Sequence, residues 1–74
     1  MKKLEELMEY VVRETTEDIT SQSREQAISD ARAIYCKLAR EHTGYSFKAI
    51  GESLGKNHAT VIHEVKNVFP QAVA

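Results

Sequence analysis

The chain has 74 residues, of which 42% are hydrophobic and 28% are charged, and its formal net charge at pH 7 is −1. This length and composition are typical of one small domain with a thin core, here residues 1–74, and they exclude a low-complexity chain. The single cysteine, Cys36, excludes an internal disulfide and a metal site built from cysteine pairs, and no apolar run reaches the roughly 20 residues of a membrane span.

The first predicted element is a helix over about residues 3–14. Its apolar residues recur at helical spacing and line one face: Leu4, Leu7, Met8 and Val11. Glutamates occupy the other face, and they interrupt the apolar core that a signal peptide needs. The pattern favours a structural helix that closes the core, with a dimerisation helix as the alternative.

A polar region separates this helix from the next one. Residues 15–20 are predicted to form a short turn of helix, with Ile19 as its apolar anchor. Residues 20–26 are polar throughout and are interpreted as a loop. Ser23 and Gln26 also have the spacing of a capping box, which would start the next helix early.

The strongest helical pattern in the chain extends from about Asp30 to His42. Two adjoining apolar stripes, formed by Ala27, Ile28, Ala31, Ile34, Tyr35 and Leu38, make one wide face. A face this wide predicts a central helix that packs on two sides. Thr43 and Gly44 end the pattern.

Residues 46–66 predict two helices joined by a tight turn, the helix-turn-helix arrangement. The first helix, capped by Ser46, carries an apolar stripe formed by Phe47, Ile50 and Leu54. Gly55 favours the left-handed end of this helix, and Asn57 is a suitable N-cap for the second. Gly51 lies inside the first helix, where glycine costs about 1 kcal/mol relative to alanine, so we expect a neighbouring helix to approach it closely.

The second of these helices has two unlike faces on a helical wheel. Apolar residues gather on one arc: Val61, Ile62, Val65, Val68 and Phe69. Small, polar and cationic residues gather on the other: Ala59, Thr60, His63, Lys66 and Asn67. Such a face suits the major groove of DNA, where bulky acids would be repelled, although an ordinary solvated face has the same pattern. Pro70 ends the helix, and the tail 70–74 is expected to fray.

The charges are unevenly distributed along the chain. Residues 1–30 contain four basic and eight acidic residues, a net charge of −4, whereas residues 31–74 contain six basic and three acidic residues, a net charge of +3. The basic half is the half with the helix-turn-helix pattern, so we expect a modest affinity for DNA. An uneven surface charge without DNA binding is the alternative.

Neither a catalytic site nor a metal site is predicted. His58 and His63 are five residues apart, so they do not share a helix face as a chelating i, i+4 pair would. The sequence has no phosphate-binding glycine loop and no nucleophile paired with a base. We therefore predict no enzyme activity, no cofactor and no small-molecule substrate.

A specific set of residues in the second half resembles a known family. It comprises Arg32, the run Leu38-Ala39-Arg40-Glu41-His42-Thr43, the pair Ile50-Gly51, the pair Leu54-Gly55, and the run Lys56-Asn57-His58-Ala59-Thr60-Val61. In order and spacing these residues resemble the C-terminal DNA-binding domain of DnaA, the bacterial chromosomal replication initiator. The resemblance covers about residues 15–69.

The resemblance implies an all-α fold, a small helical bundle with a helix-turn-helix, similar to Trp repressor. It also implies sequence-preferring binding to double-stranded DNA, as in replication initiation, but without the ATPase domain. The implied base contacts are Asn57, His58, Ala59 and Thr60 in the major groove, and Arg24 in the minor groove. The implied backbone contacts are Arg32, Lys48, Lys56 and His63, to which the polar arc adds Lys66.

Three residues depart from the family pattern. Asn57 replaces an aspartate, Ala59 replaces a threonine, and Ala31 replaces a proline. Aspartate accepts from cytosine, whereas asparagine suits adenine, so the preferred site is expected to differ from the family's usual nine-base-pair box.

The expected partner is therefore double-stranded DNA, and a monomer is favoured because the family domain binds DNA as one unit. The expected location is the cytoplasm, at the nucleoid. The alternative function is a protein–protein interaction module that kept the fold but lost most of its DNA affinity.

Overall fold

Four α-helices account for most of residues 2–21 and 25–69, the two ranges that the computed structural model describes. They are α1 (Lys2–Thr15), α2 (Gln26–Thr43), α3 (Phe47–Ser53) and α4 (His58–Val68). Within these ranges there is no strand, and no helix is long and apolar enough to cross a membrane. The predicted all-α bundle with a helix-turn-helix is confirmed.

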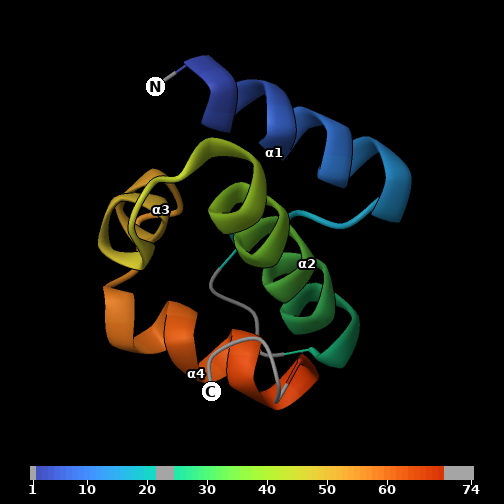
Figure 1. Cartoon of the computed structure of the whole chain (residues 1–74). Coiled ribbons are helices and arrows are strands. Elements are labelled where there is room, and N and C mark those ends of the chain that lie inside the picture. Colours follow the sequence, from blue (N-terminus) through green and yellow to red (C-terminus); the bar gives the residue numbers. More distant parts are fainter. Residues whose placement is uncertain (1, 22–24, 70–74) are drawn as a thin grey trace.

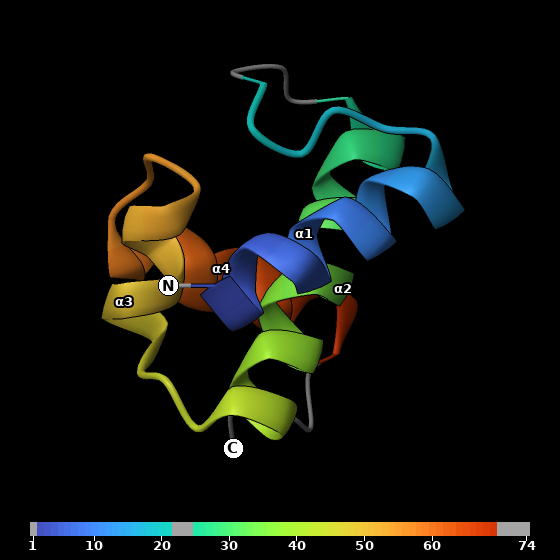
Figure 2. The same cartoon turned by 90° about the horizontal axis from the view of Figure 1, so that it is seen from above.

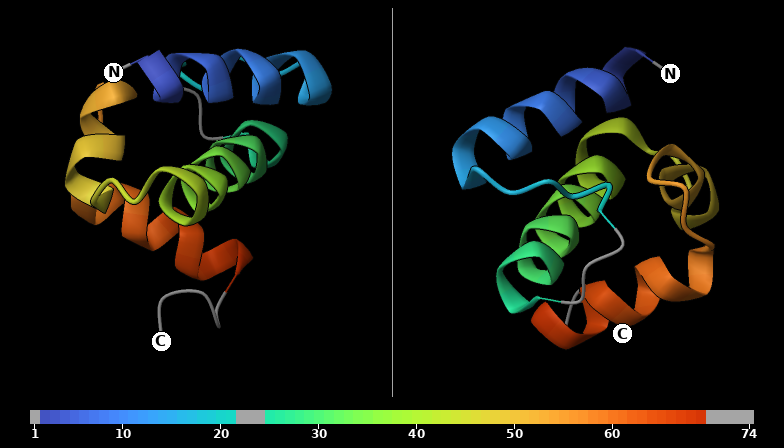
Figure 3. Two further views of the ribbon diagram at one scale, coloured as in Figure 1. Left: turned by 45° about the horizontal axis from the view of Figure 1, so that its top comes forward. Right: turned by 180° about the vertical axis from the view of Figure 1, so that it is seen from behind.

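α2 is the central helix, and α1 and α4 lie on opposite sides of it (Figures 1 and 3). Seen from above, α1 crosses over α2 (Figure 2). α3 lies at one end of the bundle and packs against α2 and α4. A wide apolar face suits this central position, and the buried apolar residues of α2 are Ile28, Ala31, Ala33, Tyr35, Cys36 and Ala39. Of the face predicted from the sequence, Ile28, Ala31 and Tyr35 are buried, Ile34 and Leu38 are half-buried, and Ala27 is exposed.

The core is formed where these helices meet. α1 contributes Leu4 and Val11, and Ile19 anchors the segment after α1, as predicted. Each such aliphatic side chain stabilises the fold by about 1.5–3 kcal/mol when fully buried. The Tyr35 hydroxyl lies 2.7 Å from the Ser53 hydroxyl and so satisfies its polar group at the contact of α2 with α3.

Two sequence-based boundaries are wrong. Residues 16–20 form no helix, because Thr16 adopts a left-handed conformation with φ of 57° that ends α1. Asp18 then accepts hydrogen bonds from the amide and hydroxyl of Thr20, which holds a turn instead. α2 begins at Gln26 rather than near Asp30. Ser23, the first residue of the proposed capping box, lies outside the described residues.

The helix-turn-helix closes as its sequence predicts. The Ser46 hydroxyl accepts from the Ala49 amide at 3.2 Å and caps α3. Gly55 has a φ of 71°, the left-handed conformation expected of the turn. The Asn57 side chain accepts from the Thr60 amide at 2.9 Å and caps α4.

Gly51 allows the turn to fold back onto α3. A methyl group at its Cα would lie 2.9 Å from the Lys56 carbonyl oxygen and 3.0 Å from Cγ2 of Val61. The Gly51 carbonyl also accepts from the Lys56 amide at 2.8 Å. The predicted close approach at Gly51 is therefore confirmed.

Candidate nucleic-acid interface

One face of α4 is exposed, and it carries the residues predicted to read DNA. Asn57, His58, Ala59, His63, Lys66 and Asn67 are exposed, and Thr60 is half-buried. Val61 and Val65 on the opposite side are completely buried. The two arcs of the helical wheel therefore correspond to the outer and inner faces of the helix.

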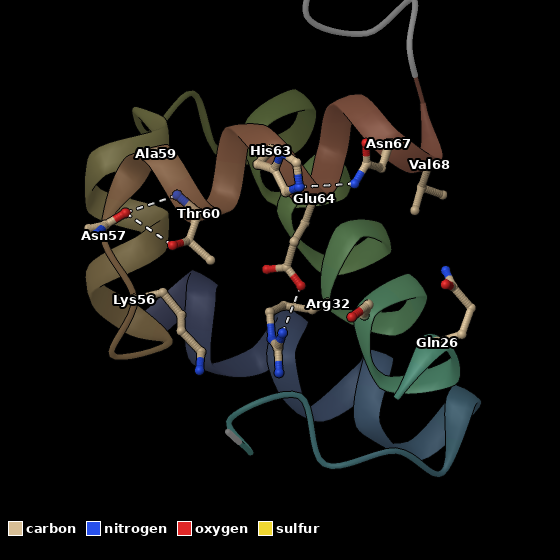
Figure 4. A pocket seen from close by; sticks show the side chains of 11 residues that line it. Gln26, Arg32, Lys56, Asn57, Ala59, Thr60, His63, Glu64, Asn67 and Val68 are labelled. Carbon is tan, nitrogen blue, oxygen red and sulfur yellow. Dashed lines mark hydrogen bonds and ion pairs between the residues drawn. The ribbon is translucent and has the colours of Figure 1, made fainter. Parts of the chain in front are cut away.

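A cleft of about 720 Å³ runs along this exposed face, between α4 and the first turns of α2. Asn57, Ala59, Thr60 and His63 line it from the α4 side, and Gln26 and Ser29 line it from the α2 side (Figure 4). Arg32 and Glu64 lie between the two sides and point toward one another. The cleft therefore brings four predicted contact residues of α4 close to α2.

Asn57 and Thr60 are coupled by the cap of α4. The Asn57 side-chain oxygen, Oδ1, accepts from the Thr60 amide at 2.9 Å and from the Thr60 hydroxyl at 3.1 Å. A carbonyl oxygen has two lone pairs, so this cap occupies both of them. Only the side-chain N–H groups of Asn57 then remain available to a base. The two-bond contact to adenine that the sequence suggests also needs the side-chain oxygen, which the cap already uses.

His63 is bound to its neighbour one turn along α4. Its Nε2 atom lies 3.2 Å from Nδ2 of Asn67. An amide nitrogen only donates, so Nε2 is the acceptor and Nδ1 carries the proton of the neutral ring.

Arg32 lies in a different environment from an ordinary phosphate contact. Its side chain is buried, with 4% of the residue exposed. The guanidinium donates to the carbonyl oxygens of Ile19 at 2.9 Å and Ser21 at 2.7 Å, and to Oε2 of Glu64 at 2.7 Å. With only 4% of the residue exposed, Arg32 offers little of its guanidinium to a DNA phosphate in this arrangement.

The role of Glu64 was missed by the sequence prediction, which assigned this residue no function. Only 8% of it is exposed, and its Oε1 atom is buried with no hydrogen-bond partner in the described part of the chain. A signal was present: Glu64 follows Val61 and precedes Val68 at the i, i+3, i+7 spacing of the buried stripe. Arg32 is likewise a charged residue among the buried apolar positions of α2. Because a buried charge needs a partner of opposite charge, these two positions together indicate a buried ion pair.

The remaining predicted cations differ in their surroundings. Lys48 and Lys66 are exposed on α3 and α4. Lys56 lines the cleft, and its ammonium donates to the Ser21 carbonyl at 3.3 Å. Arg24, the predicted minor-groove contact, lies outside the described residues.

The buried titratable groups of the core do not form a reactive site. Burial, followed by the negative charge of Glu64, raises the pKa of the Cys36 thiol to about 12, so the thiol is protonated and a poor nucleophile at neutral pH. Among residues 2–21 and 25–69, no three histidine, cysteine or acidic side chains are placed to hold a metal ion.

Comparison with known proteins gives one consistent family. A family model described as the bacterial DnaA protein helix-turn-helix matches residues 4–68. The chain is similar to the chromosomal replication initiator protein DnaA of Desulfatibacillum aliphaticivorans, with 43% identity over 53 residues, which cover 72% of this chain and 12% of that protein.

Two further relatives carry the same name. The protein from Porphyromonas gingivalis is 48% identical over 48 residues, covering 64% of this chain and 10% of the relative. The protein from Kosmotoga olearia is 36% identical over 61 residues, covering 82% of this chain and 14% of the relative. The chain thus spans between 10% and 14% of the length of these three proteins. No solved structure matches it significantly.

Proposed function

Because the chain belongs to the bacterial DnaA helix-turn-helix family, we propose that it binds double-stranded DNA with sequence preference through the exposed face of α4. The observation that carries this proposal is the arrangement of α4, whose buried valines fix one face to the core while Asn57, Ala59 and His63 stay exposed on the other. A helix held in this way enters a major groove with its N-terminal residues toward the bases.

The proposed contacts fall into two groups. Asn57, His58, Ala59 and Thr60 face base edges in the major groove, and Arg24 enters the minor groove. Lys48, Lys56, His63 and Lys66 contact phosphates and set the register, and Arg32 joins them only if it leaves its buried partners. The chain acts as a monomer in the cytoplasm, at the nucleoid, and needs no cofactor.

The role in replication is a separate part of the proposal. The relatives are initiators of chromosomal replication by name, and each is several times longer than this chain. The family match covers the DNA-binding helix-turn-helix, which is not catalytic. We infer that the chain recognises a site related to the family's DNA box, and that melting of an origin requires parts that these 74 residues do not contain.

Selection of bound sequences from a random pool of duplex DNA tests this function. The chain should enrich one short motif, and the double variant Asn57→Ala/Thr60→Ala should lose that preference. Lys56→Ala should weaken binding to all sequences alike and lower the salt slope by about 1, because it removes a phosphate contact. Lys3→Ala on α1 removes the same charge on the far side of α2 and should leave binding almost unchanged. Absence of any binding to duplex DNA at low salt would reject the proposal.

The alternative, a protein-docking module, has one observation in its favour. The outer face of α1 is acidic and exposes two large side chains, Tyr10 at 47% and Val12 at 36%. If a partner protein binds this face, the Tyr10→Lys variant should lose that binding and still bind DNA. A stable complex that duplex DNA does not compete for would favour this alternative.

A further inference from the structure

The buried carboxylate of Glu64 lies in the wall of the cleft that we propose as the DNA-binding surface. One of its oxygens accepts from Nη1 of Arg32 at 2.7 Å. The other oxygen, Oε1, points away from Arg32 toward the part of the cleft lined by Lys56 and Thr60, and it has no hydrogen-bond partner among the described residues (Figure 4). A carboxylate in this position is unusual for a surface that attracts phosphates.

The pair changes the charge of the cleft. Arg32 would supply one positive charge to a DNA backbone, but Glu64 neutralises it at hydrogen-bonding distance. Two further hydrogen bonds, to the carbonyls of Ile19 and Ser21, hold the guanidinium in place. The pair therefore contributes no net positive charge to the cleft, although Arg32 is one of the residues that line it.

We propose that Glu64 limits the affinity of this face for the DNA backbone. It does so by neutralising Arg32 in the wall of the cleft, so that a larger share of binding depends on base contacts. The inference rests on the proposed DNA-binding function. In this role Glu64 holds Arg32 in place and cancels its charge, and it makes no direct contact with a base.

The variant Glu64→Gln tests the charge with little change in shape, because glutamine keeps an oxygen for Arg32. Binding to a random-sequence duplex, measured by fluorescence anisotropy, should become several-fold tighter at low salt. One additional effective cation raises the salt slope by about 0.9, so the gain should shrink roughly three- to fourfold between 50 and 200 mM salt. Glu9→Gln is the matched control, since Glu9 is exposed on α1, on the side of α2 opposite α4.

The double variant Arg32→Met/Glu64→Leu provides a second test that preserves the net charge of the chain. Apolar side chains of similar volume replace a buried ion pair with little loss of stability. If Arg32 is neutralised by Glu64, this variant should bind DNA at least as tightly as the natural chain. If Arg32 instead contacts phosphate, as the family resemblance implies, binding should weaken. Thermal unfolding of each variant establishes that it is folded.

The outcomes separate the inference from the function on which it rests. If the natural chain binds duplex DNA but the Glu64→Gln variant binds it no more tightly than the Glu9→Gln variant, the inference is overturned and the DNA-binding function stands. If only the Glu64→Gln variant binds duplex DNA, the inference is supported and DNA binding is rejected as the function of the natural chain. If no variant binds duplex DNA, both are overturned.

Discussion

Replacing Gly51 by alanine tests how the turn of the helix-turn-helix positions α4. The added methyl group would lie 2.9 Å from the Lys56 carbonyl oxygen and 3.0 Å from Cγ2 of Val61, closer than ordinary van der Waals contact. The nearer atom belongs to the backbone, so a side-chain rotation cannot relieve the contact. The turn, and with it the first residues of α4, must move.

Two opposing effects set the magnitude. Alanine is favoured over glycine inside a helix by about 1 kcal/mol. Overpacking of a close contact costs about 1–3 kcal/mol. We therefore expect a net loss of up to about 2 kcal/mol, and each kcal/mol lowers the melting temperature of a domain of this size by about 4–8 °C. Circular dichroism during heating measures this change.

Gly44→Ala is the matched control for DNA binding. Gly44 has a φ of 74° but no atom within 4 Å of an added methyl group. Alanine there should lose about 1–2 kcal/mol through backbone strain without moving α4. At a temperature where both variants are folded, Gly51→Ala should bind DNA more weakly than Gly44→Ala. A Gly51→Ala variant that is more stable than the natural chain would refute the argument from close approach.

Three further predictions concern stability. Arg32→Ala should lower the free energy of unfolding by about 3–5 kcal/mol, because it leaves Glu64 buried without a counter-ion. Urea unfolding measures this change, and a decrease below about 1 kcal/mol would show that the fold does not need the ion pair. Asn57→Ala should lower the free energy of unfolding by about 0.5–2 kcal/mol, because α4 loses its N-cap, whereas Asn57→Ser should keep most of the stability that the cap provides. Equal melting temperatures for the two variants would contradict the capping role. Burial raises the pKa of Cys36 to about 12 from its ordinary value of 9.0, so the folded chain keeps a proton that the unfolded chain loses, and the free energy of unfolding should fall as the pH rises above 9. Melting curves at neutral and alkaline pH test this, and Cys36→Ala should weaken the dependence.

The helices and their buried faces were predictable because they depend on local spacing. The stripes of α2 and α4 repeat at helical intervals, and Ser46, Gly55 and Asn57 are residue types with a specific role at helix ends. The start of α2 was misplaced because a polar stretch before a helix contains several acceptable starting residues. The segment after α1 was misjudged because the side-chain hydrogen bonds of Asp18 competed successfully with a helical turn.

The charge of the candidate site was less predictable. Arg32 and Glu64 are 32 residues apart, so no local pattern joins them, and only their positions inside two apolar stripes indicated a pair. The hydrogen bonds from Arg32 to Ile19 and Ser21 depend on where the segment after α1 returns to the bundle. Such contacts follow from the tertiary arrangement rather than from the pattern of any one helix.

The cap that Asn57 provides restricts how the proposed DNA specificity of this protein can change over evolutionary time. Under the proposed base contact, a substitution at this position that alters the base read must also cap α4, because the Asn57 side chain accepts from the Thr60 amide. Only asparagine, aspartate, serine, threonine and glycine cap well. New specificities are therefore reached through a small set of residues here, while Ala59 and His63, which cap nothing, are free to vary more widely. A mutational library of α4 should show this as a narrow tolerance at one position beside broad tolerance at its neighbours.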